Sequence, residues 1–458
     1  MGVETIEQAI ASAKSGAYRI VEMKRRLATT GLFESSWQDI SSDVKKWGSI
    51  KINAEGDRLG TYTLDGVRMV FQNDEGRYNP DDDEGSLWSG YLNQQRTLVR
   101  IRAGLYHQTQ SANGIWNRRY FPGSANWDEG HWDVDPWDSS DQIFIGIIAG
   151  ELLLGDNNEV TIPIKPLTQV FRDFPAAALT GLNNSLTASG FIRLLRDQTD
   201  GAGSFIFRPF FGDTTSNWDI QSTTNIYADL STVTSQEIVN SSVWDVIEKL
   251  AEAENYAAYV DPSGVFHFAP KSATTTVAFE FHGLGSFNST YGHTIKKIER
   301  FGKDFSKYYS RVVVKYRPED TATSYVATMG SFSVSGTNQR WALGFKTLEL
   351  ENFWIADLTA ASSIVNALFT EFSQLKDVIE FRTSFIPHLD ILDRISVSYD
   401  ASSRGDGPEL WDVNDWDTEL TWDDSTGDAI RLDGAEFKFL TMEINLDALE
   451  CKFKARQI

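Results

Sequence analysis

The chain contains very little cysteine and histidine. Among its 458 residues there are one cysteine, Cys451, and six histidines. A disulfide framework and a cysteine-rich zinc site are therefore excluded, and we expect a chain that folds in a reducing cytoplasm with no metal and no cofactor. Its length predicts about three domains, each large enough to bury a core of its own.

Long hydrophobic runs are missing as well. The most apolar stretch near the middle covers only residues 143–154 and includes Glu151, whereas a membrane-spanning helix needs about 20 apolar residues. The N-terminus places a polar stretch before Lys24, Arg25 and Arg26, which reverses the order of a signal peptide. We therefore expect no membrane anchor and no export signal.

Positive charge is scarce relative to negative charge. Lys and Arg total 42 against 64 Asp and Glu, which gives a formal net charge of −22 at pH 7. Such a surface repels polyanions, because attraction to phosphates supplies most of the non-specific affinity for nucleic acids. Tight binding of nucleic acid is not expected.

The usual sequence signatures of catalysis are also absent. The chain has no GxxxxGK[ST], no GxGxxG after a strand, no HExxH and no GxSxG motif. Glycoside hydrolysis needs only two suitably spaced carboxylates, for which Asp133, Asp135 and Asp138 are candidates, although a solvated surface role is favoured for them. We expect that the protein is not an enzyme and keep a carbohydrate-binding or glycan-cleaving protein as the alternative.

Short alternating segments dominate what is present. Residues 67–71, VRMVF, put apolar side chains on one face of a strand. An amphipathic stripe over residues 243–251 follows a capping box of Ser242 and Asp245, and a hairpin over residues 256–269 comes after it. A second helix is predicted at residues 357–376. The pattern is that of a β-rich α+β chain with barrel-like β-domains.

Tryptophan is followed by aspartate more often than the acid content predicts, in eight of 14 cases. Six of these pairs form two clusters with spacings of five or six, at Trp127, Trp132 and Trp137 and at Trp411, Trp416 and Trp422. A spacing of five gathers rings on one side of neither a strand nor a helix, which favours loops. The rings then either bind a glycan or a neighbouring subunit or pin long loops onto their own domain.

Three segments of the first part follow one another in a recognisable order. Residues 37–41 read WQDIS, residues 71–80 read FQNDEGRYNP and residues 98–101 read LVRI. They resemble the opening domain of tail-tip hub proteins of long-tailed bacteriophages, with W-x-D-[VI], N-x-D-G-R-[FY]-x-P and V-R-[IV] elements. The turn reads Asn-Asp-Glu-Gly here, a mild departure. The resemblance continues in four later segments, residues 243–251, 259–268, 311–316 and 386–397.

The resemblance implies a multidomain tail hub with two related β-barrel-like domains and a smaller α/β middle domain. Its expected limits are an N-terminal arm at 1–17, a first hub domain at 18–165 with a Trp-Asp loop at 110–142, a middle domain at 166–270, and a second hub domain at 271–458 with the helix at 357–376 and a Trp-Asp loop at 402–434.

The resemblance also implies a function. A homotrimer would close the distal end of a phage tail tube, present six barrels to a six-fold tube and gate the channel for DNA ejection. Its partners would be the distal tail protein, the tape measure protein and tail fibre or tip proteins, and DNA would pass without specific binding. The expected location is the virion tail tip after assembly in the host cytoplasm. The same hub in a gene-transfer particle or a contractile injection machine is a further reading.

Overall fold

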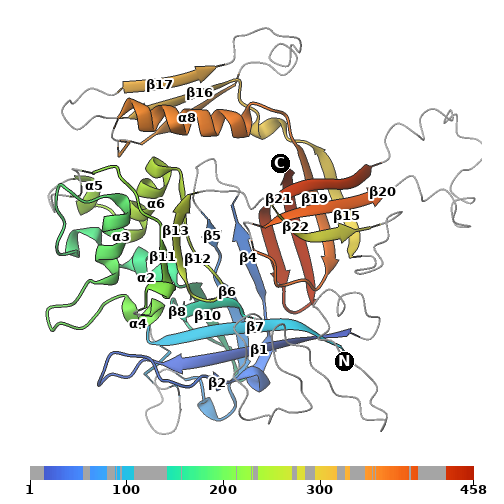
Figure 1. Ribbon diagram of the computed structural model, residues 1–458. Helices are drawn as coiled ribbons and strands as arrows, with labels where there is room; N and C mark the ends of the chain where they lie inside the picture. Colours follow the sequence, from blue (N-terminus) through green and yellow to red (C-terminus); the bar gives the residue numbers. More distant parts are fainter. Residues whose placement is uncertain are drawn as a thin grey trace, which may run out of the picture.

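We analysed a computed structural model of the chain (Figure 1). The structure describes residues 15–54, 62–79, 88, 90–92, 95–107, 142–155, 157–212, 214–227, 230, 236–270, 276–283, 294–316, 325–330, 346–352, 354–355, 357–390, 393–400 and 430–458. Two large curled sheets, a smaller mixed unit and a small sheet with one helix make up this part of the chain, which confirms the β-rich α+β class.

The first large sheet has eight strands, all antiparallel to their neighbours, in the order β2-β1-β7-β8-β10-β6-β3, with β9 beside β10. Their bounds are β1 Ser15–Arg25, β2 Gln38–Asp39, β3 Val44–Lys46, β6 Val67–Gln72, β7 Thr97–His107, β8 Gln142–Ile148, β9 Leu153–Gly155 and β10 Glu159–Pro166. In β6 the predicted alternation is confirmed, because Val67, Met69 and Phe71 are buried. β1 begins inside the predicted arm because β7 is long enough to pair with Ser15–Ala17.

The middle unit combines short helices with a three-stranded sheet of order β11-β13-β12. Its elements are α2 Thr168–Asp173, α3 Ala188–Arg196, α4 Arg208–Phe211, β11 Trp218–Ile220, α5 Gln236–Val239, α6 Val243–Glu254, β12 Tyr256–Val260 and β13 Phe266–Pro270. The predicted helix and hairpin are confirmed, and the capping box forms between Ser242 and Asp245. Helix α6 ends at Asn255, which adopts a left-handed conformation.

The second large sheet also has eight strands, and its main path runs β14-β20-β21-β22-β19-β15. Their bounds are β4 Ser49–Asn53, β5 Thr63–Leu64, β14 Val277–His282, β15 Ile295–Lys303, β19 Asp377–Ser384, β20 Arg394–Asp400, β21 Arg431–Asn445 and β22 Glu450–Gln457. Only β14 and β20 run parallel among these pairs. Strand β21 begins at Arg431, within the segment predicted as the second Trp-Asp loop.

A small sheet of order β17-β16-β18 packs against one helix. Its elements are β16 Arg311–Tyr316, β17 Tyr325–Gly330, β18 Thr347–Glu351 and α8 Leu358–Phe372. The helix predicted at 357–376 starts as expected, since the Asp357 side chain accepts from the Ala360 N–H. It ends four residues early, because the Tyr309 N–H binds the Phe372 carbonyl and β19 begins at Asp377.

Single turns of 3-10 helix lie in several of the connections. They are η1 Ser41–Asp43, η2 Asp74–Gly76, η4 Ala176–Ala178, η5 Thr215–Asn217 and η7 Phe305–Lys307.

Two hydrophobic cores hold these parts together. One core joins the middle unit, helix α8 and its small sheet to one face of the first large sheet, where Leu98, Ile145 and Ile147 contribute. The other core joins the two large sheets and includes Phe71, Phe144 and Phe439 from opposite ends of the sequence. The first large sheet is therefore buried on both faces over part of its area.

Strands β4 and β5 cross from the first part of the chain into the second large sheet. Strand β4 pairs with residues 441–445 of β21, beside the half of β21 that does not pair with β20. Figure 1 shows both strands rising between the middle unit and the second sheet. The predicted limits of 18–165, 166–270 and 271–458 remain predictions, and the pairing shows that backbone hydrogen bonds connect the first and last of these ranges.

The joint between the two large sheets lies at Trp47 and Gly48. The Asp447 carboxylate accepts the Trp47 and Gly48 N–H groups at 2.9 and 3.0 Å. The Leu446 N–H donates to the Gly48 carbonyl at 3.0 Å, and Arg19 of β1 stacks over Trp47 while donating to the Leu446 carbonyl. Strands near both ends of the sequence are thereby fixed at one point.

Candidate interaction site

The six tryptophans predicted as binding residues lie outside the described residues. These are Trp127, Trp132, Trp137, Trp411, Trp416 and Trp422, and the same holds for Asp133, Asp135 and Asp138. Their role as binding residues or loop anchors stays a prediction.

Two further Trp-Asp pairs are described and show what the pairing does locally. Trp218 and Trp244 are buried, and the Trp218 indole donates to the Gly212 carbonyl at 3.1 Å. Asp219 and Asp245 lie at the surface side of the same segments, where Asp245 caps α6 and Asp219 binds a histidine. In these pairs the ring supplies buried area while the carboxylate makes local hydrogen bonds.

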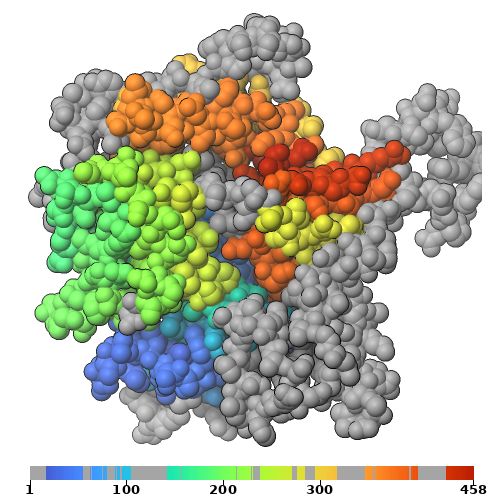
Figure 2. Space-filling model, in the orientation of Figure 1, coloured from blue at the N-terminus to red at the C-terminus, as the bar shows by residue number. Residues whose placement is uncertain are grey.

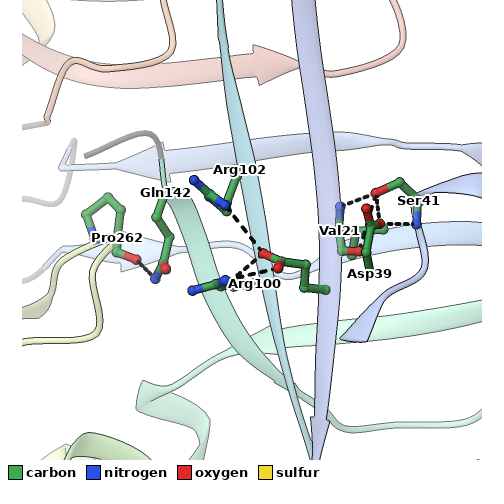
Figure 3. A network of polar contacts seen from close by, with 8 residues as sticks. Val21, Asp39, Ser41, Arg100, Arg102, Gln142 and Pro262 are labelled. Atoms are coloured by element: carbon green, nitrogen blue, oxygen red, sulfur yellow. Dashed lines mark hydrogen bonds and ion pairs between the residues drawn. The ribbon is translucent and has the colours of Figure 1, made fainter. Parts of the chain in front are cut away.

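The residues of the opening motif mainly build the fold. Ile40 is buried, and its N–H binds the Val21 carbonyl at 3.0 Å. The Asp39 carboxylate accepts the Ser41 N–H at 2.8 Å, while the Ser41 hydroxyl accepts the Val21 N–H at 2.9 Å (Figure 3). The WQDIS segment is thus fastened along β1, which explains its residue types without a ligand.

The turn motif is likewise a packing unit. Tyr78 is fully buried, and its hydroxyl donates to Asp43 at 2.5 Å. The Asn73 side chain accepts the Tyr78 N–H at 2.7 Å, and Arg77 forms an ion pair with Asp43 at 2.9 Å. Gly76 has a φ of +70°, which explains the glycine at that position.

A buried ion pair connects the two central strands of the first sheet. Glu22 of β1 lies opposite Arg100 of β7, which donates to both of its carboxylate oxygens at 2.6 and 3.0 Å. Arg102, only 1% exposed, approaches the same carboxylate at 4.0 Å, and Figure 3 shows both arginines directed toward it from β7. One carboxylate thus faces two guanidinium groups.

Beside this pair the first sheet is attached to the middle unit. The Gln142 amide at the start of β8 donates to the Pro262 carbonyl at 2.5 Å (Figure 3). Pro262 lies in the turn between β12 and β13. This contact places the tip of the predicted hairpin against the first sheet.

Cations and aromatic rings alternate along the edge of the first sheet that continues from this ion pair. We call Lys24, Arg25, Arg26, Arg96 and Arg100 the basic strip. Lys24 Nζ and Arg100 Cζ lie 4.7 and 4.4 Å from the centre of Trp37.

Two further rings carry the remaining cations of the basic strip. The Arg25 and Arg96 guanidinium carbons lie 5.3 and 5.9 Å from the centre of Tyr91. Arg26 lies 5.0 Å from the centre of Phe210, a residue of α4 in the middle unit. Cation–π contacts of this kind hold a charged group near a partly dehydrated surface.

A cavity of about 410 Å³ opens where the basic strip meets the middle unit. Arg26, Thr29 and Thr30 line it from the first sheet, and Asp173 and Phe205 line it from the middle unit. In Figure 2 the N-terminal part of the chain, in blue, lies directly beneath the green middle unit and shares a surface with it. Phe205 is 38% exposed, so an apolar side chain is available at this rim.

A histidine of the middle unit is held between two carboxylates. His267 of β13 binds Asp219 of β11 through Nδ1 and Asp261 of the hairpin turn through Nε2, both at 3.1 Å. Its ring stacks on Tyr259 with centres 4.8 Å apart, and Tyr259 meets Tyr62 edge to face at 5.6 Å. The contacts therefore link the middle unit to the segment that enters the second sheet.

The charge of this histidine is set by two opposing effects. Burial disfavours the imidazolium, but the hydrogen bonds to Asp261 and Asp219 outweigh it and raise the pKa of His267. Burial likewise works against the charged form of Asp261, yet the bonds from His267 and Ser263 lower its pKa. No pattern in the sequence pointed to this arrangement, because the three residues come from separate segments.

Metal binding and membrane crossing find no support in the described ranges. No group of three or more His, Cys, Asp or Glu side chains among these residues could hold a metal ion. The described helices include none with both the length and the apolar character that a bilayer crossing requires.

The comparisons with known proteins point to tail proteins. No family model matches the sequence, and no curated protein matches it. The structure is similar to a tail protein from Neisseria meningitidis, with 9% identity, a TM-score of 0.49 and 96% of each chain covered. It is also similar to a 43 kDa tail protein of prophage MuSo2 from Shewanella oneidensis, with 11% identity, a TM-score of 0.45 and 96% and 98% of the two chains covered.

A third solved structure is the prophage tail protein gp18 from Listeria monocytogenes. It shows 9% identity and a TM-score of 0.46 over 95% of this chain and 94% of the other. These neighbours are prophage tail proteins, which is the kind of protein that the ordered motifs of the sequence resemble.

Proposed function

We propose that the chain is a non-enzymatic structural component of a phage tail that acts as the hub at the tail tip. As a homotrimer it closes the distal end of the tail tube and connects the distal tail ring to fibres or tip proteins. It gates the channel through which DNA is ejected and meets the tape measure protein on the inner side.

The observation that carries this proposal is the pair of eight-stranded sheets in one chain, combined with the order of hub-like motifs along the sequence. Three chains would place six such sheets around a threefold axis, which fits a six-fold tube. A closed ring of this kind also follows the symmetry expected of homo-oligomers.

The joint between the sheets supports a mechanical role. Strand β4 leaves the first sheet at Gly48 and pairs with β21, so that a force on one sheet is carried by backbone hydrogen bonds into the other. A hub that holds a tube and fibres needs such continuity. The negative charge of the chain, −22, leaves ejected DNA free to slide, since it offers little phosphate attraction.

The test is the mass of the full-length purified protein in solution. Light scattering should give about three times the 51.4 kDa of one chain. A monomer at all concentrations tested contradicts the trimeric hub. Turnover of a sugar polymer by the purified protein, abolished by changing one acidic side chain, would instead establish the glycan-cleaving alternative.

A further inference from the structure

The basic strip has more positive charge than the described residues around it neutralise. Glu34 forms an ion pair with Arg25, and Glu22 forms one with Arg100. Lys24, Arg26 and Arg96 have no carboxylate partner within ion-pair distance among the described residues. Arg26 donates to the Gly31 carbonyl at 2.7 Å and Arg96 to the Gly90 carbonyl at 3.1 Å, so both are oriented by neutral groups.

These cations also repel one another. Burial lowers the pKa of Lys24, and the charge of Arg100 lowers it further. Burial lowers the pKa of Arg26, and the charge of Arg96 adds to this effect. Placing like charges together on a partly dehydrated surface costs free energy, which an anionic partner would offset.

The arrangement favours carboxylates over the other common anions. The aromatic rings of the strip already hold cations, with Trp37 and Tyr91 each contacting two, so they are poor platforms for stacking nucleic-acid bases. The net charge of −22 repels a long polyanion such as DNA. Guanidinium groups match the geometry of a carboxylate, and short acidic segments carry less total charge than DNA.

The cavity beside Arg26 gives the partner a fixed position. Hydroxyl and amide groups of Thr29, Thr30 and Gln95 face the same space as the ring of Phe205. A side chain with both polar and apolar parts fits such a lining. The strip and the cavity together define a surface where charge supplies attraction and the cavity supplies register.

We propose that the basic strip and its cavity bind an acidic segment of a partner polypeptide. The carboxylates of that segment face Lys24, Arg26 and Arg96, and one of its side chains enters the cavity. The inference does not depend on the trimeric hub, because the surface is complete within one chain.

The experiment measures binding of a fluorescent peptide of about twelve alternating glutamate and serine residues to the full-length protein at low salt. The triple variant K24A/R26A/R96A should bind the peptide about tenfold more weakly than the unchanged protein. The matched control K46A/K51A/K165A removes the same charge from exposed lysines on the same part of the chain and should change affinity less than about twofold.

Folding of each variant is checked by its near-ultraviolet circular dichroism. If the triple variant does not fold, the variant K24Q/R96Q keeps Arg26 on Phe210 and should still weaken binding several-fold. No binding by the unchanged protein, an equal loss in the control variant, or tighter binding of single-stranded DNA of equal charge would each overturn the proposal.

Discussion

Gly48 is the position where a single methyl group most directly tests the joint between the two large sheets. Its φ is +73°, a conformation that costs a residue with a side chain about 1–2 kcal/mol. A Cβ atom there would also lie 2.6 Å from the Arg68 carbonyl oxygen, which belongs to the backbone of β6 and cannot turn away. Overlap of this kind typically costs about 1–3 kcal/mol more.

The variant G48A should therefore lower the free energy of unfolding by about 2–5 kcal/mol. The control is G434A, because Gly434 has a similar φ of +59° but no atom within 4 Å of its added Cβ. This control should lose only about 1–2 kcal/mol. Urea unfolding followed by tryptophan fluorescence measures both values. If G48A is no less stable than G434A, the close contact with β6 and the fixed joint are wrong.

Three further predictions concern other parts of the chain. H267Q should lose stability mainly in acid: the raised pKa of His267 means that its charge stabilises the fold fully below about pH 6.5 and less as pH rises through the folded pKa, so the loss, of order 1 kcal/mol, should be larger near pH 6 than near pH 9 in thermal or urea unfolding; equal losses at both pH values would contradict it. Cys451 is buried with its thiol pKa raised to about 12, so a thiol reagent at about pH 8 should react with the native protein only as fast as it unfolds, and rapid labelling without denaturant would show the site to be open. Replacing Trp127, Trp132 and Trp137 together by Ala should reduce the fraction of assembled particles with no loss of any turnover, and full infectivity of the triple variant would remove their anchoring role.

Local features of the fold could be read from the sequence because their causes lie within a few residues. Ser242 and Asp245 are three positions apart, so their capping box and the start of α6 are visible in the sequence. The alternation of Val67, Met69 and Phe71 likewise predicts the buried face of β6.

Long-range pairing could not be predicted in the same way. Nothing in the residues of β4 identifies β21 as its partner, because pairing depends on backbone register and on where the rest of the chain places both strands. The end of α8 was misplaced for a related reason: Leu375 continues the apolar stripe, but contacts from Tyr309 and β19 end the helix first.

The basic strip shows how far a sequence pattern reaches. The run of Lys24, Arg25 and Arg26 is evident, yet in the sequence it argued only against a signal peptide. Its significance comes from the β1–β7 register, which sets Glu22 opposite Arg100, and from the loop that carries Trp37 back to both strands. A strand with adjacent cations near a tryptophan is a signal that could have suggested it.

Electron microscopy of the purified full-length protein tests the central claim most directly. The account predicts class averages with threefold symmetry and a central opening, built from three copies of a chain that holds two interlocked sheets. Compact single chains without symmetry, at concentrations where the protein is folded, would contradict it.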